Sequence, residues 1–229
     1  MAHRPIFIPG ELKGPLFREV SIQFKWHAGL AASQRKKCVH ELHEEAARAG
    51  YDDVLEVSTK SDAEIGRRLS AFRLDVSLGK HRTKIECLYQ GAKVFEKGGP
   101  FPELFALKPI EAKRFFRDKS LGLITHFQVD ETIFENLPFH AFYDWLFIRA
   151  LAEHKDFLRE GLEQFGSFSD IEFNPKRSIN TQARTIAIIK NLIERDDIEA
   201  CANSYDYFRT LLTDIETKHK PQIELGLAS

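Results

Sequence analysis

Apolar side chains recur at helical spacing over much of the chain, which predicts that helices dominate the fold. The segment 139–151 is apolar nearly all round, so we expect its helix at the centre of the core. The longest predicted helices span 33–49, 85–95, 139–151, 178–194 and 204–218, with shorter ones at 102–107 and 110–118.

Strand signals are fewer and shorter than helix signals. The clearest is Phe72–Leu78, where apolar and polar residues alternate ahead of a turn at Gly79 and Lys80. Residues 1–20 are expected to form an irregular lead-in. Other short strands are predicted at 20–26, 54–57 and 168–173. Because strands and helices do not alternate as in a parallel sheet, the pattern predicts a single α+β domain, dominated by helices, with a few short strands.

Length and charge exclude few classes of function. The 229 residues suffice for one large domain with a substantial core. Lys and Arg together number 33 and Asp and Glu 34, so the formal net charge is -1. This balance excludes a uniformly basic nucleic-acid-binding protein but permits a local basic patch.

Cysteine spacing and the apolar runs favour a cytoplasmic protein. Cys38, Cys87 and Cys201 lie far apart and match neither a disulfide framework nor a metal site. His40 and His43 have no evident third ligand, so we expect neither a metal nor a cofactor. No apolar run approaches the roughly 20 residues that span a bilayer. The N-terminal segment also lacks the apolar core of a secretory signal.

Three polar residues in the helix predicted at 85–95 form a candidate site. Glu86, Gln90 and Lys93 are spaced so that a helix would place them on one face about two turns long. A carboxylate, an amide and an amine in one line could bind a sugar and transfer protons. The same spacing is also typical of a solvated surface stripe, so spacing alone leaves both interpretations open.

The order of motifs around this segment resembles the NADAR superfamily, which includes the YbiA-like N-glycosidases. In that family a Phe-Ser-Asn-Phe element precedes a strand, a turn and a helix of the form Glu-x-x-Tyr/Phe-Gln-x-x-Lys. The residues that resemble these two elements are Leu69, Ser70, Ala71, Phe72, Glu86, Tyr89, Gln90 and Lys93.

Two later segments also resemble family blocks. Residues 112–118 are similar to an Ala-x-x-x-Gly-Arg block, with Phe116 in place of the glycine. Residues 178–186 are similar to a Gly-x-Asn-x-x-Gly-x-x-Leu block that retains Asn180. Ala71 stands where the broader family has asparagine, so an amide contact is lost or supplied by another residue. The family's late Trp-Gly element is absent, and residues 170–175 could take its place.

The whole chain is most similar to one branch of the family, the NADAR antitoxins associated with DarT toxins. The segments that carry this similarity are 24–29, 55–61, 90–100, 142–146 and 168–175. The resemblance implies a YbiA-like NADAR fold over a single domain, 1–229. We expect an N-terminal elaboration at 1–60, a motif-bearing core at 61–195 and a C-terminal helix at 196–229.

The resemblance also implies a function. DarT toxins attach ADP-ribose to DNA bases, and this branch is paired with toxins that modify guanine. The implied activity is therefore an N-glycosidase, an ADP-ribosylglycohydrolase that cleaves the bond between the guanine amino nitrogen and C1 of the distal ribose. The implied partners are ADP-ribosylated, single-stranded DNA, ADP-ribose as product and a DarT-type toxin. The basic groups at 35–37 and 176–177 could contact DNA phosphates.

Catalytic and binding roles follow from the same resemblance. Glu86 would stabilise positive charge on the sugar carbon, activate water or donate a proton. Lys93 would contact the leaving base, trap the opened sugar as a Schiff base, or hold Glu86 in an ion pair. Asn180 is expected at a helix start, where backbone N–H groups favour a pyrophosphate. Substrate contacts are expected from Trp26, Lys37, Lys60, Ser70, Phe72, Tyr89, Gln90, Asp170, Asn174 and Asn180.

Two other functions stay open on the sequence. The near-neutral charge also permits an N-glycosidase that acts on a small nucleotide or a riboflavin-pathway intermediate. Ala71 and the missing Trp-Gly element instead permit an antitoxin that binds its toxin without catalysis.

Overall fold

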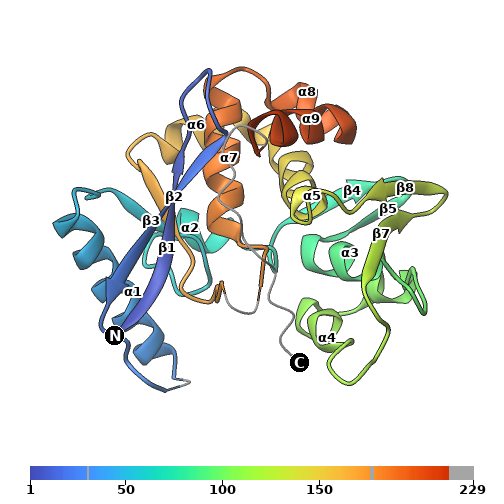
Figure 1. The fold of residues 1–229 in the computed structure, drawn as a ribbon, viewed down its shortest axis with the longest axis horizontal. Helices are drawn as coiled ribbons and strands as arrows, with labels where there is room; N and C mark the ends of the chain where they lie inside the picture. The colour runs from blue at the N-terminus through green and yellow to red at the C-terminus, as the bar shows by residue number, and fades with distance from the viewer. Residues whose placement is uncertain (30, 176–177, 217–229) are drawn as a thin grey trace.

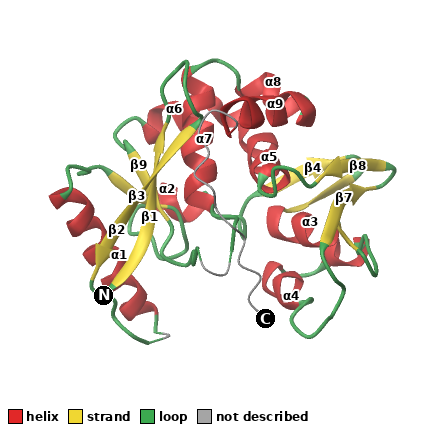
Figure 2. Ribbon diagram, viewed as in Figure 1, coloured by secondary structure: helices red, strands yellow, loops and turns green. Residues whose placement is uncertain are grey.

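The structure of the chain, a computed structural model, describes residues 1–29, 31–175 and 178–216. A group of strands lies on each side of the molecule, and helices lie between and above the two groups (Figure 1). Figure 2 shows that helices also pack beside each strand group. The predicted α+β class is confirmed.

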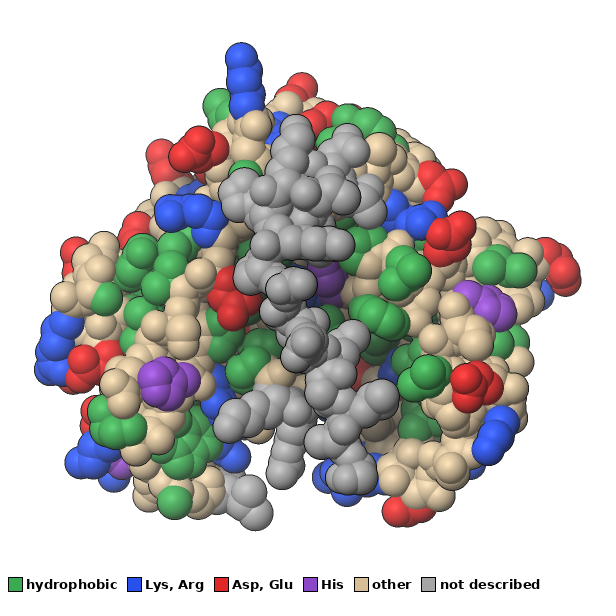
Figure 3. Space-filling model, in the orientation of Figure 1, with side chains coloured by type: hydrophobic (Ala, Val, Ile, Leu, Met, Phe, Trp, Pro, Cys, Tyr) green, Lys and Arg blue, Asp and Glu red, His purple; other side chains and the backbone are tan. Residues whose placement is uncertain are grey.

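The surface matches the balanced composition. Acidic and basic side chains are interspersed over the face shown in Figure 3. Among the helices that the structure describes, none has both the length and the apolar character that crossing a bilayer requires.

Helices form most of the core. As predicted, α5 lies at its centre, since Phe142, Leu146 and Phe147 are all fully buried. The predicted helix at 178–194 begins later, at Gln182. The helix predicted at 204–218 is present as α9, and its predicted last two residues lie outside the described residues. Helices η2, α6 and α8 were not predicted. In chain order, with η for a 3-10 helix, the bounds are α1 (Ala32–Arg48), α2 (Glu64–Arg68), α3 (Ile85–Gly91), η1 (Pro102–Ala106), α4 (Pro109–Arg114), α5 (Ala141–Leu151), η2 (Ala152–His154), α6 (Lys155–Leu162), α7 (Gln182–Glu194), α8 (Ile198–Asn203) and α9 (Tyr205–Glu216).

The first strand group is a four-stranded sheet in the order β2-β1-β9-β3. Strands β1 and β2 form an antiparallel hairpin, while β9 pairs antiparallel with β1 and parallel with β3. The early strands are thereby bonded to a strand that comes late in the sequence. The bounds are β1 (Ala2–Pro9), β2 (Phe17–Phe24), β3 (Val54–Glu56) and β9 (Ser167–Ser169).

Strand β1 shows that the irregular lead-in expected over residues 1–20 was wrong. Ile6 and Phe7 are both buried because successive side chains of a strand point to opposite faces. Ile6 packs among residues of α1, and Phe7 packs in the main core with residues of α7. Prolines at 5 and 9 weaken the strand signal. Neither interrupts the ladder with β9, because β9 pairs only with Ile6 and Phe7.

The second strand group contains two small sheets, with strand orders β4-β5 and β6-β7-β8. Strand β4 starts at Asp75 instead of Phe72, because the backbone N–H groups of Arg73 and Leu74 donate to the Ser70 carbonyl in a turn. The predicted turn after β4 joins it to β5, whereas hairpin β7–β8 was not predicted. The bounds are β4 (Asp75–Leu78), β5 (His81–Lys84), β6 (Lys93–Phe95), β7 (Ile124–Val129) and β8 (Thr132–Glu135).

Helix α3 ends earlier than predicted. The expected helix at 85–95 stops at Gly91, a residue with low helix propensity. Residues Lys93–Phe95 instead form β6, which pairs with β7. A side chain at position 91 would also clash, because a Cβ there would lie 2.5 Å from the Phe105 ring. Lys93 therefore belongs to a strand and not to the helix that carries Glu86.

A buried ion pair joins the two central helices. The Arg184 guanidinium on α7 donates to both carboxylate oxygens of Asp144 on α5 at 3.2 Å. Thr185 donates its hydroxyl to the same carboxylate, and the His140 ring lies 2.8 Å from it. Although burial alone would raise it, the pKa of Asp144 is held below its usual value by Arg184 and His140. The same Arg184 also donates to the Ile179 carbonyl at 2.7 Å.

This arrangement predicts a large stability loss on removal of the arginine. We expect Arg184→Met to lower the free energy of unfolding by about 3 kcal/mol, because it leaves the Asp144 carboxylate buried without its counter-charge. Urea denaturation followed by circular dichroism measures the change. Arg48→Met is the control, since the Arg48 side chain is 66% exposed and should change stability by less than about 1 kcal/mol. Equal losses in the two variants would contradict the role of the ion pair.

Candidate active site

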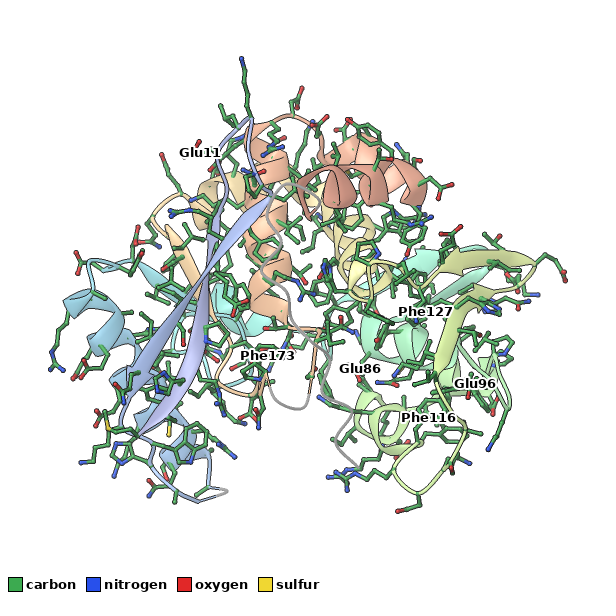
Figure 4. All side chains as sticks on the ribbon, viewed as in Figure 1. Glu11, Glu86, Glu96, Phe116, Phe127 and Phe173 are labelled. Carbon is green, nitrogen blue, oxygen red and sulfur yellow. The ribbon has the colours of Figure 1, made fainter. Side chains whose placement is uncertain are left out.

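A pocket with a volume of about 530 Å³ opens between the two strand groups. One wall comes from β1, the segment after β2, α1 and the loop after β9. The other comes from α3, α4 and the turn before β4. In Figure 4, Phe173 and Glu86 mark the two walls and lie across the central space from each other.

Helix α3 places Glu86 in the wall of this pocket. The Glu86 side chain is only 5% exposed. Its Oε1 accepts a hydrogen bond from Gln90 Nε2 at 2.8 Å, one helical turn later. Gln90 Oε1 in turn accepts from Lys93 Nζ at 2.7 Å. The three residues are therefore connected in the order expected from the sequence, although Lys93 reaches Gln90 from β6.

The Lys93 amine lies close to two aromatic rings. Its Nζ is 4.6 Å from the centre of the Tyr89 ring and 5.5 Å from that of Phe116. Burial lowers the pKa of the Lys93 amine to about 8, with an added effect of the Lys113 charge and against the effect of Glu86. Shifts of this kind are common for lysines that react as neutral amines.

Asn180 contacts Tyr89 on α3. Its Nδ2 donates to the Tyr89 hydroxyl at 2.7 Å, and burial raises the pKa of Tyr89 so that the phenol stays protonated. Among the described residues, Asn180 Oδ1 is buried without a hydrogen-bond partner. Asn180 was expected in the turn at a helix start, and it lies two residues before the first residue of α7. The N-cap of α7 is Thr181, and Asn180 lies in the preceding loop, which Arg184 holds through the Ile179 carbonyl.

The loop after β9 places a second carboxylate in the pocket. Asp170 accepts a hydrogen bond from Thr181 at 3.2 Å and is almost fully buried. Glu56 lies behind it and accepts hydrogen bonds from Ser169 Oγ at 2.6 Å and from the Ile171 backbone N–H at 2.9 Å. Burial raises the pKa of both carboxyl groups, and the charge of Asp170 raises that of Glu56 further.

The structure gathers most of the residues singled out in the sequence. Gln90 contacts Glu86, and Lys93 contacts both Gln90 and the Tyr89 ring, although none of these three residues lines the pocket itself. The pocket itself is lined by six of the predicted residues, Trp26, Phe72, Glu86, Asp170, Asn174 and Asn180.

Three other predicted residues do not line the pocket. Ser70 is buried, and its hydroxyl accepts a hydrogen bond from the Phe72 backbone N–H at 3.4 Å. Lys37 is exposed on α1, and Lys60 donates to Thr59 outside the pocket. The predicted basic group at 176–177 lies outside the described residues.

Several pocket residues were missed in the sequence. Arg4, Lys113, Tyr143 and Gln182 line the pocket, and Arg35 was considered only as part of a basic surface group. Gln182 Oε1 accepts a hydrogen bond from the Ala71 backbone N–H at 2.8 Å. An amide side chain thus lies beside Ala71, although it comes from α7 and no local pattern indicated it.

In the described part of the chain, no group of three or more His, Cys, Asp or Glu side chains is placed to hold a metal ion.

Similarity to known proteins identifies the family. No curated protein matches the sequence. A family model described as "DarT1-associated NADAR antitoxin" matches residues 2–222. This match covers nearly the whole chain and confirms the resemblance drawn from the motifs around Glu86. The chain therefore belongs to the family of DarT1-associated NADAR antitoxins.

Proposed function

We propose that the chain is an N-glycosidase that removes ADP-ribose from guanine bases in DNA and thereby reverses the action of a DarT-type toxin. The observation that carries this proposal is the contact series Glu86–Gln90–Lys93, whose first member, Glu86, lines a nucleotide-sized pocket. It supplies a carboxylate and an amine of lowered pKa, the two groups that cleavage of a glycosidic bond can use. Family membership supports the antitoxin role.

Glu86 acts on the sugar in this proposal. Departure of the guanine amino group leaves positive charge on C1 of the ribose, and a nearby carboxylate stabilises that charge. Glu86 is suited to this role because it is held by Gln90 and shielded from bulk water. An electrostatic interaction is stronger in such surroundings than in water.

Lys93 supplies the amine. Because the pKa of the Lys93 amine is about 8, about a tenth of the molecules carry this amine in its neutral form at pH 7. The neutral amine attacks C1, so that a bond forms between Nζ and C1 and the bond from C1 to the guanine amino nitrogen breaks. The proton that Nζ loses in this step passes to the departing guanine nitrogen. Water then hydrolyses the Lys93–sugar adduct, which releases ADP-ribose and restores the amine.

Glu86→Gln tests the carboxylate. The change keeps the shape of the side chain but removes its negative charge, so we expect the rate of ADP-ribose release to fall by about 100-fold or more. The assay mixes the purified chain with guanine-ADP-ribosylated single-stranded DNA and follows free ADP-ribose by chromatography.

Glu103→Gln is the matched control, because Glu103 is exposed on η1 and does not line the pocket. It should release ADP-ribose at the rate of the unchanged chain. Full release by the Glu86 variant, or no release by the unchanged chain, would refute the proposed enzyme. Protection of toxin-expressing cells by Glu86→Gln would instead support toxin binding without catalysis.

A pH profile and Lys93→Arg test the amine. Because only the neutral amine attacks C1, the rate should rise with pH and level off above an apparent pKa near 8. Lys93→Arg keeps a cation near Gln90 but cannot lose its proton, so we expect about a 100-fold loss at every pH. A rate that falls as the pH rises through 8, together with an active arginine variant, would show that the cation only positions Glu86.

A further inference from the structure

The pocket wall opposite Glu86 carries an aromatic ring with two guanidinium groups close to it. The guanidinium carbons of Arg4 and Arg35 lie 5.1 and 4.8 Å from the centre of the Trp26 ring. All three residues line the pocket. Arg4 comes from β1, Trp26 from the segment after β2 and Arg35 from α1, so the β1–β2 pairing and the packing of α1 bring them together.

These two cations are only partly neutralised. Among the described residues, Arg35 pairs with a single carboxylate, that of Glu172 at 3.9 Å. Arg4 donates to the backbone carbonyl of His3 at 2.9 Å, and its Nε is buried without a hydrogen-bond partner in the part of the chain that the structure describes. Burial, followed by repulsion from Arg35, lowers the pKa of Arg4, against the smaller opposing effects of Cys38 and of Asp170, which lines the same pocket. Two positive charges are therefore held beside an open pocket, and some of their N–H groups remain available to a ligand.

Such an arrangement suits an anion that carries charge on two adjacent groups. Each guanidinium presents a planar set of donors that binds phosphate oxygens in pairs. Stacking on Trp26 restricts both side chains before a ligand arrives, so that less conformational entropy is lost on binding. A diphosphate can engage both arginines at once, whereas a single phosphate satisfies one of them less completely.

We propose that Arg4, Trp26 and Arg35 bind the diphosphate of the substrate, so that the pocket selects a sugar attached to a nucleoside diphosphate. This inference rests on the proposed function, because it places the diphosphate on one wall and the reacting ribose at Glu86 on the other. A nucleoside monophosphate or a flavin precursor without a diphosphate would leave one of the two guanidinium groups without its anion.

Isothermal titration calorimetry of the full chain with ADP, AMP and adenosine tests the proposal without turnover. We expect Arg4→Gln and Arg35→Gln each to weaken ADP binding by about tenfold, AMP binding by less, and adenosine binding not at all. The ADP affinity of Arg35→Lys should lie between those of the unchanged chain and Arg35→Gln, because lysine keeps the charge but not the planar donors. Arg48→Gln, at the far end of α1 and outside the pocket, is the matched control and should bind ADP normally.

Glu172→Gln should have the opposite effect. Its carboxylate competes with the ligand for Arg35, so we expect its removal to tighten ADP binding by about threefold. Thermal melting of each variant checks that the chain remains folded. A gain of affinity in this variant also cannot arise from unfolding.

The outcomes separate the sources of phosphate. Unchanged ADP binding in both arginine variants would overturn the proposal, as would equal losses for ADP and adenosine. A second titration uses an unmodified single-stranded oligonucleotide. Weaker oligonucleotide binding with unchanged ADP binding would assign the arginines to the DNA backbone and also overturn the proposal. Because these are binding measurements, absence of ADP-ribose release would refute the proposed enzyme and leave the diphosphate site standing.

Discussion

The ion pair between Asp144 and Arg184 is the interaction on which the rest of the structure depends. It fixes α5 against α7 in the middle of the core, where a lone charge would be strongly unfavourable. Helix α7 packs on β1 and β9, and α5 packs on α3 and β4, so the pair sets the position of one strand group relative to the other. The contact between α5 and α7 therefore also determines the width of the pocket between those groups.

The two walls of the pocket differ in chemistry. The wall on α3 presents the Glu86 carboxylate, which is connected by hydrogen bonds to the Gln90 amide and, through it, to the Lys93 amine on β6, and this set of groups suits bond cleavage. The wall on β1 and α1 contains two guanidinium groups on one aromatic ring, which suits anion binding. A chain with a net charge of -1 can therefore present a locally basic site without a basic surface.

Local sequence patterns predicted the parts of the fold that depend on local interactions. The central position of α5 and the contact between Glu86 and Gln90 both follow from spacing within one helix. The position of Lys93 in a strand could not be predicted in this way, because pairing of β6 with β7 replaces the last turn of the predicted helix. Arg4 could not be identified as a pocket residue, since β1 reaches the site only by pairing with β2 and β9. Non-local pairing of this kind leaves no periodic signal in the segment itself.

The pairing of β1 with β9 also has a consequence for synthesis of the chain on the ribosome. Arg4 emerges before Glu86, and Asp170, Asn180 and α7 emerge after both. The early strands cannot complete their sheet until residues 167–169 arrive, and contacts of such long sequence separation form slowly. A fragment that ends before residue 167 would therefore lack β9 and the pocket residues that follow it, so both its sheet and its pocket would be incomplete.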